Sequence, residues 1–325
     1  MRRLVLLICT TCLAFAQSQI LRMPKVDPAI PSYAYSGPLL GGTIESSGAD
    51  SLADVWDEWQ QGFRSLHPGV EFRVVQTLTK TAFDALMAGT VPIIHTAREL
   101  SIPEYQAFEK KWGYPPTKVL VCFDAYIVFV NSSNPIKELG MDQLDAALST
   151  SRAAGYPKDV ETWGDLGGRG DWAKRPIHVY FRAEGTASWA VVKELVLQKG
   201  EFKAKLIDKP DDPSIADAVI TDSNGLAIGT LATWYTRNRT LAVTPLHGRD
   251  ALLPTQENVV SGRYPMSKGF YLYVNRAPGK ALPPVLTEFL HFALSQEGQQ
   301  AVARSSLYPL PADLAAMNRK RVRIN

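Results

Sequence analysis

Hydroxyl side chains occur at three places where a strand-like segment of the sequence passes into a helix-like one. Residues 46–51 end in Ser51, directly before a helical pattern, residues 79–81 read Thr-Lys-Thr, and residues 182–188 begin with an arginine and end with a serine. The backbone N–H groups at the start of a helix lack partners within the helix, and hydroxyls add further donors at close range. Three such junctions predict a site for an anion.

The third junction adds a positive charge to this predicted site. Arg182 offers a planar guanidinium that matches two oxygens of a tetrahedral oxyanion, and Glu184 is expected to hold that guanidinium in orientation. Each residue also has a plainer interpretation, with Ser51 as the N-cap of its helix and Arg182 in a surface ion pair. The joint pattern favours the ligand site, because open α/β sheets bind ligands at the carboxyl ends of their strands.

The spacing of apolar residues places these junctions in a chain of alternating strands and helices. The predicted strands cover residues 42–45, 70–75, 91–94, 118–130, 177–181, 218–220, 226–228 and 269–274. The predicted helices cover residues 52–66, 82–88, 102–112, 141–148, 188–197, 284–294 and 297–304. We expect residues 17–38 to form an extended leader outside the core and residues 308–311 to end the packed part. The alternation predicts the α/β class, with mostly parallel sheets covered on both faces.

The first sixteen residues have the pattern of a secretory signal peptide. Arg2 and Arg3 precede an apolar run, and Ala14-Phe15-Ala16 offers a cleavage site after Ala16. The run is too short to span a bilayer, which takes about 20 apolar residues. The sequence therefore predicts a periplasmic or secreted protein.

The composition agrees with a globular protein that has no strong charge bias. Of the 325 residues, 46% are hydrophobic and 21% are charged, which excludes disordered and fibrous classes. Basic side chains form no block except residues 319–323, so we expect no nucleic-acid partner. Loss of the signal peptide would leave 33 basic against 32 acidic side chains, so any preference for an anion must be local. It would also remove Cys9 and Cys12, leaving Cys122 without a disulfide partner.

At the three junctions the sequence resembles the phosphate-binding proteins of bacterial ABC transporters, which have the type II periplasmic binding protein fold. The resemblance spans residues 41 to 310, and the order and spacing of several motifs carry it rather than any single one. These motifs are GADSL at 48–52 with the Trp59 helix, FDALMAG at 83–89 leading to TAR at 96–98, residues 124–135, TWGDLGG at 162–168, RAEGTAS at 182–188, YLYVN at 271–275 and SQEGQ at 295–299.

The resemblance implies two lobes, each a mostly parallel sheet flanked by helices, with the ligand in the cleft between them and two crossing strands as the hinge. The implied division is a signal peptide (1–16), a leader (17–40), lobe 1 (41–129 plus 267–325) and lobe 2 (130–266). The implied function is capture of phosphate or a related tetrahedral oxyanion for ABC-type import, by a monomer without cofactor, metal or catalytic residues, whose partner is a permease in the inner membrane. The implied ligand contacts are Ser51, Leu52, Thr79, Lys80, Thr81, Thr96, Arg182, Thr186, Ala187 and Ser188, with Glu184 behind Arg182.

Three positions depart from the pattern of this family. The second junction has no glycine and carries Lys80, which either adds charge to the site or points to solvent. Ala187 replaces a glycine. Ala97 falls where some members have an aspartate that accepts a proton from phosphate, so the choice among oxyanions stays open.

Two other functions remain alternatives at this point. An oxyanion sensor or adhesion protein would keep the fold without a transporter, and a secreted phosphoester hydrolase would need catalytic groups. The sequence contains no Gly-x-Ser-x-Gly, P-loop or His-Glu-x-x-His motif, which disfavours the enzyme. Among five dispersed histidines, His95 next to Thr96 is the candidate for a pH-dependent affinity. Asp124 interrupts an apolar strand, and the pattern predicts either a buried partner or a position in the cleft.

Overall fold

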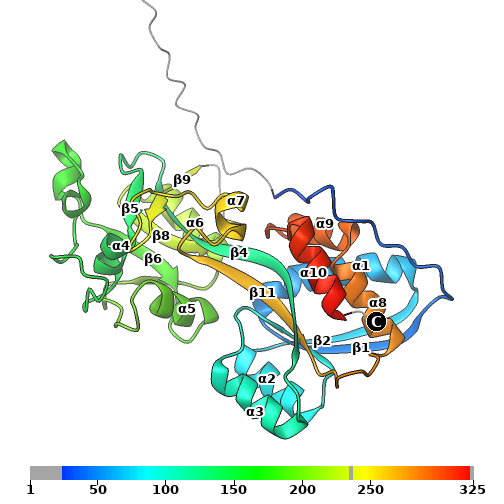
Figure 1. Cartoon of the computed structure of the whole chain (residues 1–325). Coiled ribbons are helices and arrows are strands. Elements are labelled where there is room, and N and C mark those ends of the chain that lie inside the picture. Colours follow the sequence, from blue (N-terminus) through cyan, green and yellow to red (C-terminus); the bar gives the residue numbers. More distant parts are fainter. Residues whose placement is uncertain (1–23, 234–236, 323–325) are drawn as a thin grey trace, which may run out of the picture.

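A computed structural model describes residues 24–233 and 237–322 of the chain (Figure 1). The predicted signal peptide, its cleavage site, Cys9 and Cys12 lie outside the described residues. Cys122 is buried and has a free thiol.

One curled sheet of nine strands runs through the molecule, in the order β2-β1-β3-β11-β4-β8-β6-β7, with β9 paired to β4 beside this path. The pairs of β1 with β2 and β3, and of β6 with β7 and β8, are parallel. In contrast, β11 is antiparallel to β3 and β4, and β4 is antiparallel to β8. A separate parallel pair joins β5 to β10. The strands are β1 (Gly41–Gly48), β2 (Gly69–Gln76), β3 (Ile93–Thr96), β4 (Thr117–Asn131), β5 (Glu138–Gly140), β6 (His178–Arg182), β7 (Ile207–Lys209), β8 (Gly225–Thr230), β9 (Asn238–Thr240), β10 (Ala242–Thr244) and β11 (Ser267–Val274).

Ten α-helices accompany the sheet within the described residues, and local signals explain where several of them begin and end. For example, Ser101 and Glu104 form a reciprocal capping box at the start of α3, and Gly113 ends that helix in the left-handed conformation. The helices are α1 (Ala53–Leu66), α2 (Thr79–Ala88), α3 (Ile102–Trp112), α4 (Met141–Leu148), α5 (Ala187–Leu195), α6 (Asp212–Thr221), α7 (Gln256–Val260), α8 (Pro284–Ala293), α9 (Gln296–Arg304) and α10 (Ala312–Val322). Short 3-10 turns include η1 (Asp50–Leu52), which precedes α1, and η4 (Leu231–Thr233), which follows β8.

Two large apolar cores lie on either side of the point where β4 and β11 cross between them (Figure 1). The first core takes its buried residues from 30–122 and 270–322, and the second takes them from 125–266 together with Tyr308. A smaller cluster lies between α2, α3 and the sheet. The predicted lobe limits at residues 129 and 266 stay a prediction, while the cores themselves change over at 122–125 and at 266–270.

The packing of α1 fixes the position of the first hydroxyl junction. Trp56, Trp59 and Phe63 recur at helical spacing and are fully buried. The Trp56 ring stacks on Phe289 with centroids 5.1 Å apart, and the Trp59 indole N–H donates to the carbonyl of Gly298 at 2.9 Å. The start of α1 is therefore held against α8 and α9, which lie more than 220 residues further along the chain.

From residue 24 on, the leader is extended, but the prediction that it lies outside the core is wrong. Ile30 is 2% exposed and belongs to the first core. The backbone N–H of Tyr33 donates to the Glu297 carboxylate at 2.7 Å. Upstream, Lys25 and Gln256 exchange two hydrogen bonds of 2.8 and 2.9 Å, which tie the leader to α7. The leader is rich in proline and has no apolar periodicity, so no sequence pattern pointed to these individual contacts.

Two further predictions about secondary structure are wrong. Residues 218–220 belong to α6 rather than to a strand, because Asp211 accepts a hydrogen bond from the N–H of Ser214 and a proline occupies the first turn, which starts a helix there. The packed part does not end at residue 311, since α10 follows and buries Ala315 and Val322. The basic residues near the C-terminus thus extend a packed helix.

We expect the substitution Ile30→Ala to lower the free energy of unfolding by about 2–4 kcal/mol, because it leaves a cavity in the first core. Urea denaturation followed by tryptophan fluorescence measures this change. Leu39→Ala is the matched control, since Leu39 lies in the same leader and is 75% exposed. Equal midpoints for the two variants would contradict a leader that belongs to the core.

Candidate functional site

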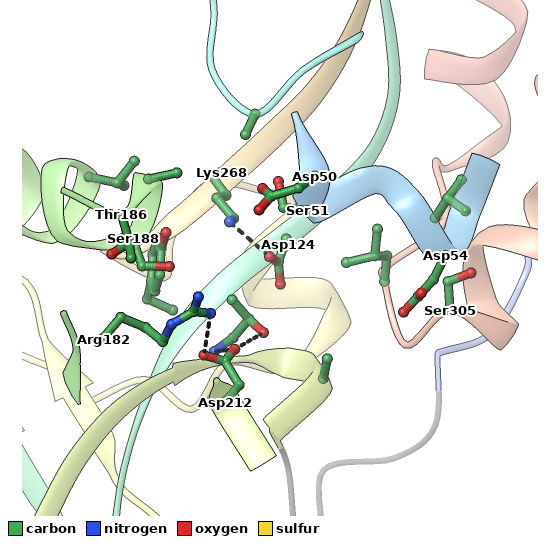
Figure 2. Close-up of a pocket in the computed structure, with 18 of the residues that line it drawn as sticks. Asp50, Ser51, Asp54, Asp124, Arg182, Thr186, Ser188, Asp212, Lys268 and Ser305 are labelled. Atoms are coloured by element: carbon green, nitrogen blue, oxygen red, sulfur yellow. Dashed lines mark hydrogen bonds and ion pairs between the residues drawn. The ribbon is translucent and has the colours of Figure 1, made fainter. Parts of the chain in front are cut away.

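A cavity of about 430 Å³ lies where the two cores meet, beside the crossing strands. Its walls come from the β1–α1 junction, the end of β6 with the start of α5, the start of α6, the end of β8, and β4 and β11 (Figure 2). Elements of both cores therefore face one space, at the carboxyl ends of parallel strands on each side.

The first junction turns an unused hydroxyl toward this cavity. Ser51 lines the cavity, and neither η1 nor α1 has a side-chain cap, so the interpretation of Ser51 as an N-cap is wrong. Gly48 at the end of β1 permits the close approach of β1 to β3, because a Cβ there would lie 1.8 Å from the carbonyl oxygen of His95. Leu52, the other predicted contact of this junction, lies outside the lining; its side chain is buried and its N–H donates to the carbonyl of Ala49 at 3.1 Å.

The second junction does not bring its polar side chains to the cavity. The cap position of α2 is Leu78, which lines the cavity, while Thr79, Lys80 and Thr81 already belong to the first turn of the helix and lie outside the lining. Lys80 points to solvent with a side chain that is 79% exposed, and it pairs with Asp84 at 3.0 Å one turn along the helix. Of the two interpretations of Lys80, the structure supports the solvent-facing one.

The third junction supplies most of the polar lining that the sequence predicts. Thr186, Ala187 and Ser188 all line the cavity. The Thr186 hydroxyl caps α5, accepting from the N–H of Trp189 at 3.2 Å and donating to the carbonyl of Ala183 at 2.8 Å. The Ser188 hydroxyl has no hydrogen bond to any described residue. One hydroxyl therefore holds the turn and the next is available to a ligand.

Arg182 points into the cavity, but its partner differs from the predicted one. Glu184 is exposed and lies outside the lining, whereas Asp212 at the start of α6 faces the guanidinium with an N–O distance of 3.6 Å (Figure 2). Asp212 is itself held by the hydroxyl of Thr230 at 2.8 Å. The Nε–H of Arg182 is buried and has no partner among the described residues, so the guanidinium keeps unused donor capacity.

The floor of the cavity carries a buried ion pair. Asp124 on β4 lies opposite Lys268 on β11 in the strand register, and the Lys268 Nζ is 3.0 Å from the Asp124 carboxylate. Asp124 thus has both a buried partner and a position at the cavity, the two possibilities that its place in an apolar strand left open. Lys268 was not predicted as a site residue, because a single lysine at the start of an apolar strand is typical of a solvent-facing side chain.

Thr96 and His95 lie behind the site rather than in it. The Thr96 hydroxyl donates to the carbonyl of Arg98 at 2.7 Å, and Ala97, its neighbour, lines the cavity. His95 is fully buried, with its ring nitrogens 2.9 Å from the Ser46 hydroxyl and 3.2 Å from the Gln76 amide oxygen. Burial lowers the pKa of His95 to about 3, so it stays neutral at ordinary pH and cannot tune affinity there.

Of the predicted contacts, the cavity lining therefore includes Ser51, Arg182, Thr186, Ala187 and Ser188. The lining also holds polar residues that the sequence did not single out for the site, namely Asp50, Asp54, Asp212, Thr230, Lys268 and Ser305. Asp50 and Asp54 lie in or next to the first predicted junction, and this position is the one sequence feature that could have identified them as site residues. The other four come from distant segments that only the fold brings together.

This set of groups suits a tetrahedral oxyanion. Free hydroxyls and two cations offer donors from both sides, and the carboxylates offer acceptors for an oxygen that carries a proton. Within residues 24–233 and 237–322, no group of three or more His, Cys, Asp or Glu side chains is placed to hold a metal ion. Over the same residues, no helix has the length and apolar character needed to cross a membrane.

Two lobes, crossing strands and a cavity between the lobes define a protein of the PBP superfamily, whose domain model matches residues 34–297. Within this superfamily the chain belongs to the family of the phosphate-binding protein PstS. It is 37% identical over 290 residues to the protein of that name from Pseudomonas aeruginosa, an alignment that covers 89% of this chain and 90% of its relative.

Solved structures show the same fold at lower identity. One is a possible phosphate binding protein from Planctomyces limnophilus, with a TM-score of 0.69 and 18% identity over 87% of this chain and 98% of that one. Another is an ABC-type phosphate transport receptor from Vibrio cholerae, with a TM-score of 0.65 and 17% identity over 82% and 99% of the two chains.

The buried His95 predicts a loss of stability in mild acid. The unfolded chain binds a proton at this ring below about pH 6.5, whereas the folded protein does so only near pH 3. The free energy of unfolding should therefore fall as the pH drops through this window, by up to about 1.4 kcal/mol per pH unit from this group. Urea denaturation at pH 7, 6 and 5 should give a steeper decline for the natural protein than for His95→Gln. His247→Gln, at an exposed ring, is the control, and parallel declines in all three proteins would refute the assignment.

Proposed function

We propose that this protein captures phosphate, or a closely related tetrahedral oxyanion, in the cavity between its lobes and delivers it to an ABC-type permease. The observation that carries the proposal is Arg182, a guanidinium that faces the cavity. Among the described residues its buried Nε–H has no partner, and its one ion pair, to Asp212, is long at 3.6 Å. A buried donor without a partner costs free energy that an anion would recover. Membership of the PstS family supplies the ligand class.

The proposed contacts come from both sides of the cavity. Ser51 would donate from the β1–α1 junction, and Arg182 and Ser188 would donate from the β6–α5 junction. An anion held by both junctions favours the arrangement that brings them together, so binding would draw the lobes closer about β4 and β11. Thr186 keeps the β6–α5 turn in shape rather than serving as the principal donor.

The carboxylates in the lining support a ligand that carries a proton. Asp50, Asp54 and Asp212 face the same cavity as Arg182. A fully ionised oxyanion offers these groups no hydrogen, whereas phosphate near neutral pH still has a P–OH group that donates to a carboxylate. These residues supply acceptors in a site where Ala97 has none, so phosphate and arsenate are preferred to sulfate in this proposal.

The remaining parts of the proposal concern where the protein acts, in what oligomeric state and with which partner. We place the mature protein in the periplasm as a monomer that acts by binding and release without catalysis, and its partner is a permease of the inner membrane. The family, the signal-peptide pattern and the lack of a recognisable catalytic motif in the sequence support this setting.

Replacing Arg182 tests the proposed site directly. Arg182→Ala should weaken phosphate binding by about 2–4 kcal/mol, or roughly 30- to 1,000-fold in Kd, because it removes charge-assisted hydrogen bonds in a partly buried site. Isothermal titration of the mature protein against phosphate, arsenate and sulfate measures this effect.

Two controls locate the effect of that substitution. Arg73→Ala removes an exposed arginine on β2, and Lys80→Ala removes the solvent-facing lysine of the second junction; both variants should bind phosphate as the natural protein does. Unchanged affinity in Arg182→Ala would remove Arg182 from the site. An absence of heat with all three anions in the natural protein would refute the proposed function itself.

A further inference from the structure

The Asp124–Lys268 pair is more deeply buried than the other ion pairs of the described residues. The Lys268 side chain is 9% exposed and that of Asp124 is 2% exposed. Removing two charges from water costs several kcal/mol per ion before their attraction repays any of it. Because β4 and β11 already share backbone hydrogen bonds, the joining of these two strands does not by itself account for a buried ion pair at this position.

Both carboxylate oxygens of Asp124 have partners. One carboxylate oxygen accepts from the N–H of Ala125 at 2.8 Å and from the N–H of Leu231 at 3.4 Å. The other oxygen accepts from Lys268. Asp124 is therefore fixed between β4 and the turn after β8, and it offers a rigid point of attachment for the lysine.

Lys268 is held in place but is not fully used. Its ammonium lies 4.5 Å from the ring centroid of Tyr126 and 5.0 Å from that of Phe270, so two aromatic faces help to seat it. Burial alone would lower the pKa of Lys268, but the adjacent Asp124 carboxylate outweighs burial and raises it, which keeps the ammonium charged. An ammonium has three donors, of which the Asp124 carboxylate takes one and the Tyr126 hydroxyl another, so one is left for a ligand.

Lys268 and Arg182 are the two cations in the described lining of the cavity. They approach it from different parts of the fold, since Arg182 ends β6 beside the second core and Lys268 lies on β11, which packs into the first core. Figure 2 shows the Lys268 ammonium on the same side of the cavity as Ser51, facing the space that Arg182, Thr186 and Ser188 border.

We propose that Lys268 is a second cationic contact of the bound anion, seated by Asp124 and Tyr126 so that its remaining donor faces the cavity. This inference rests on the proposed function and deepens it. The anion would then contact both the β6–α5 junction and the crossing strand β11. Its negative charge would therefore act directly on a strand that joins the lobes. Neutralising the pair while keeping its shape should weaken anion binding without loss of the fold.

The double variant Lys268→Met/Asp124→Asn makes this test. Methionine keeps the length and apolar contacts of the lysine, and the asparagine oxygen can still accept from Ala125 and Leu231, so no uncompensated charge remains buried. We expect inorganic phosphate to bind at least about tenfold more weakly, with a shallower dependence of Kd on NaCl concentration, while the urea midpoint stays close to that of the natural protein.

The matched control is Lys118→Met. Lys118 lies on β4, pairs with Glu99 at 2.9 Å and sits over the ring of Tyr271 at 5.5 Å, but it is outside the cavity lining. This variant should keep the phosphate affinity and the salt dependence of the natural protein. Equal loss of affinity in the control and the double variant would overturn the inference.

The possible outcomes separate the two proposals. Natural affinity and salt dependence in the folded double variant would make Lys268 purely structural and overturn the inference, while the proposed function stands on Arg182. If the natural protein itself bound no phosphate, both would fall. Should that double variant not fold, Lys268→Gln/Asp124→Asn takes its place, because it is also a neutral pair and its two amides can still hydrogen-bond to each other. A loss of phosphate affinity of about tenfold in this variant supports the contact, and unchanged affinity overturns it.

Discussion

The antiparallel pairing of β4 with β11 is the interaction on which the rest of the structure depends. Eight register pairs join the two strands, from Ser267 with Ala125 to Val274 with Thr117. β4 contributes buried residues to both apolar cores and β11 contributes buried residues to the first, so their pairing fixes how the cores are placed relative to each other. The register is irregular between Phe270 and Tyr271, on the side of the first core and two residues from Lys268 at the floor of the cavity.

The chemistry of the cavity follows from this placement. Neither core alone assembles the lining: one brings the β1–α1 junction and the other brings Arg182 with the β6–α5 junction. Most of the charges there are matched within the protein, Arg182 with Asp212 and Lys268 with Asp124. Such pairs give the site fixed dipoles and little net attraction for anions in general, which suits a site that has to distinguish one oxyanion from others by hydrogen-bond geometry.

Local patterns in the sequence were enough to predict most helices and strands and the chemistry of the third junction. The apolar spacing of α1 and the capping residues of α3 each depend only on residues that are close together in the sequence. The partners of Arg182 and Asp124 were not predictable in this way, because Asp212 and Lys268 are 30 and 144 positions away along the chain. The role of Ser51 also depended on tertiary structure, since the same serine could have capped the helix it precedes.

The docked leader has a consequence for the order of folding. The first core contains Ile30 near one end of the chain and Val322 near the other, whereas the second core is nearly contiguous in sequence. Contacts of such long range form late, because closing a long loop costs entropy before any contact repays it. The second core can therefore form while the chain is still being completed, but the first core, and with it one wall of the cavity, has to wait for the last helices.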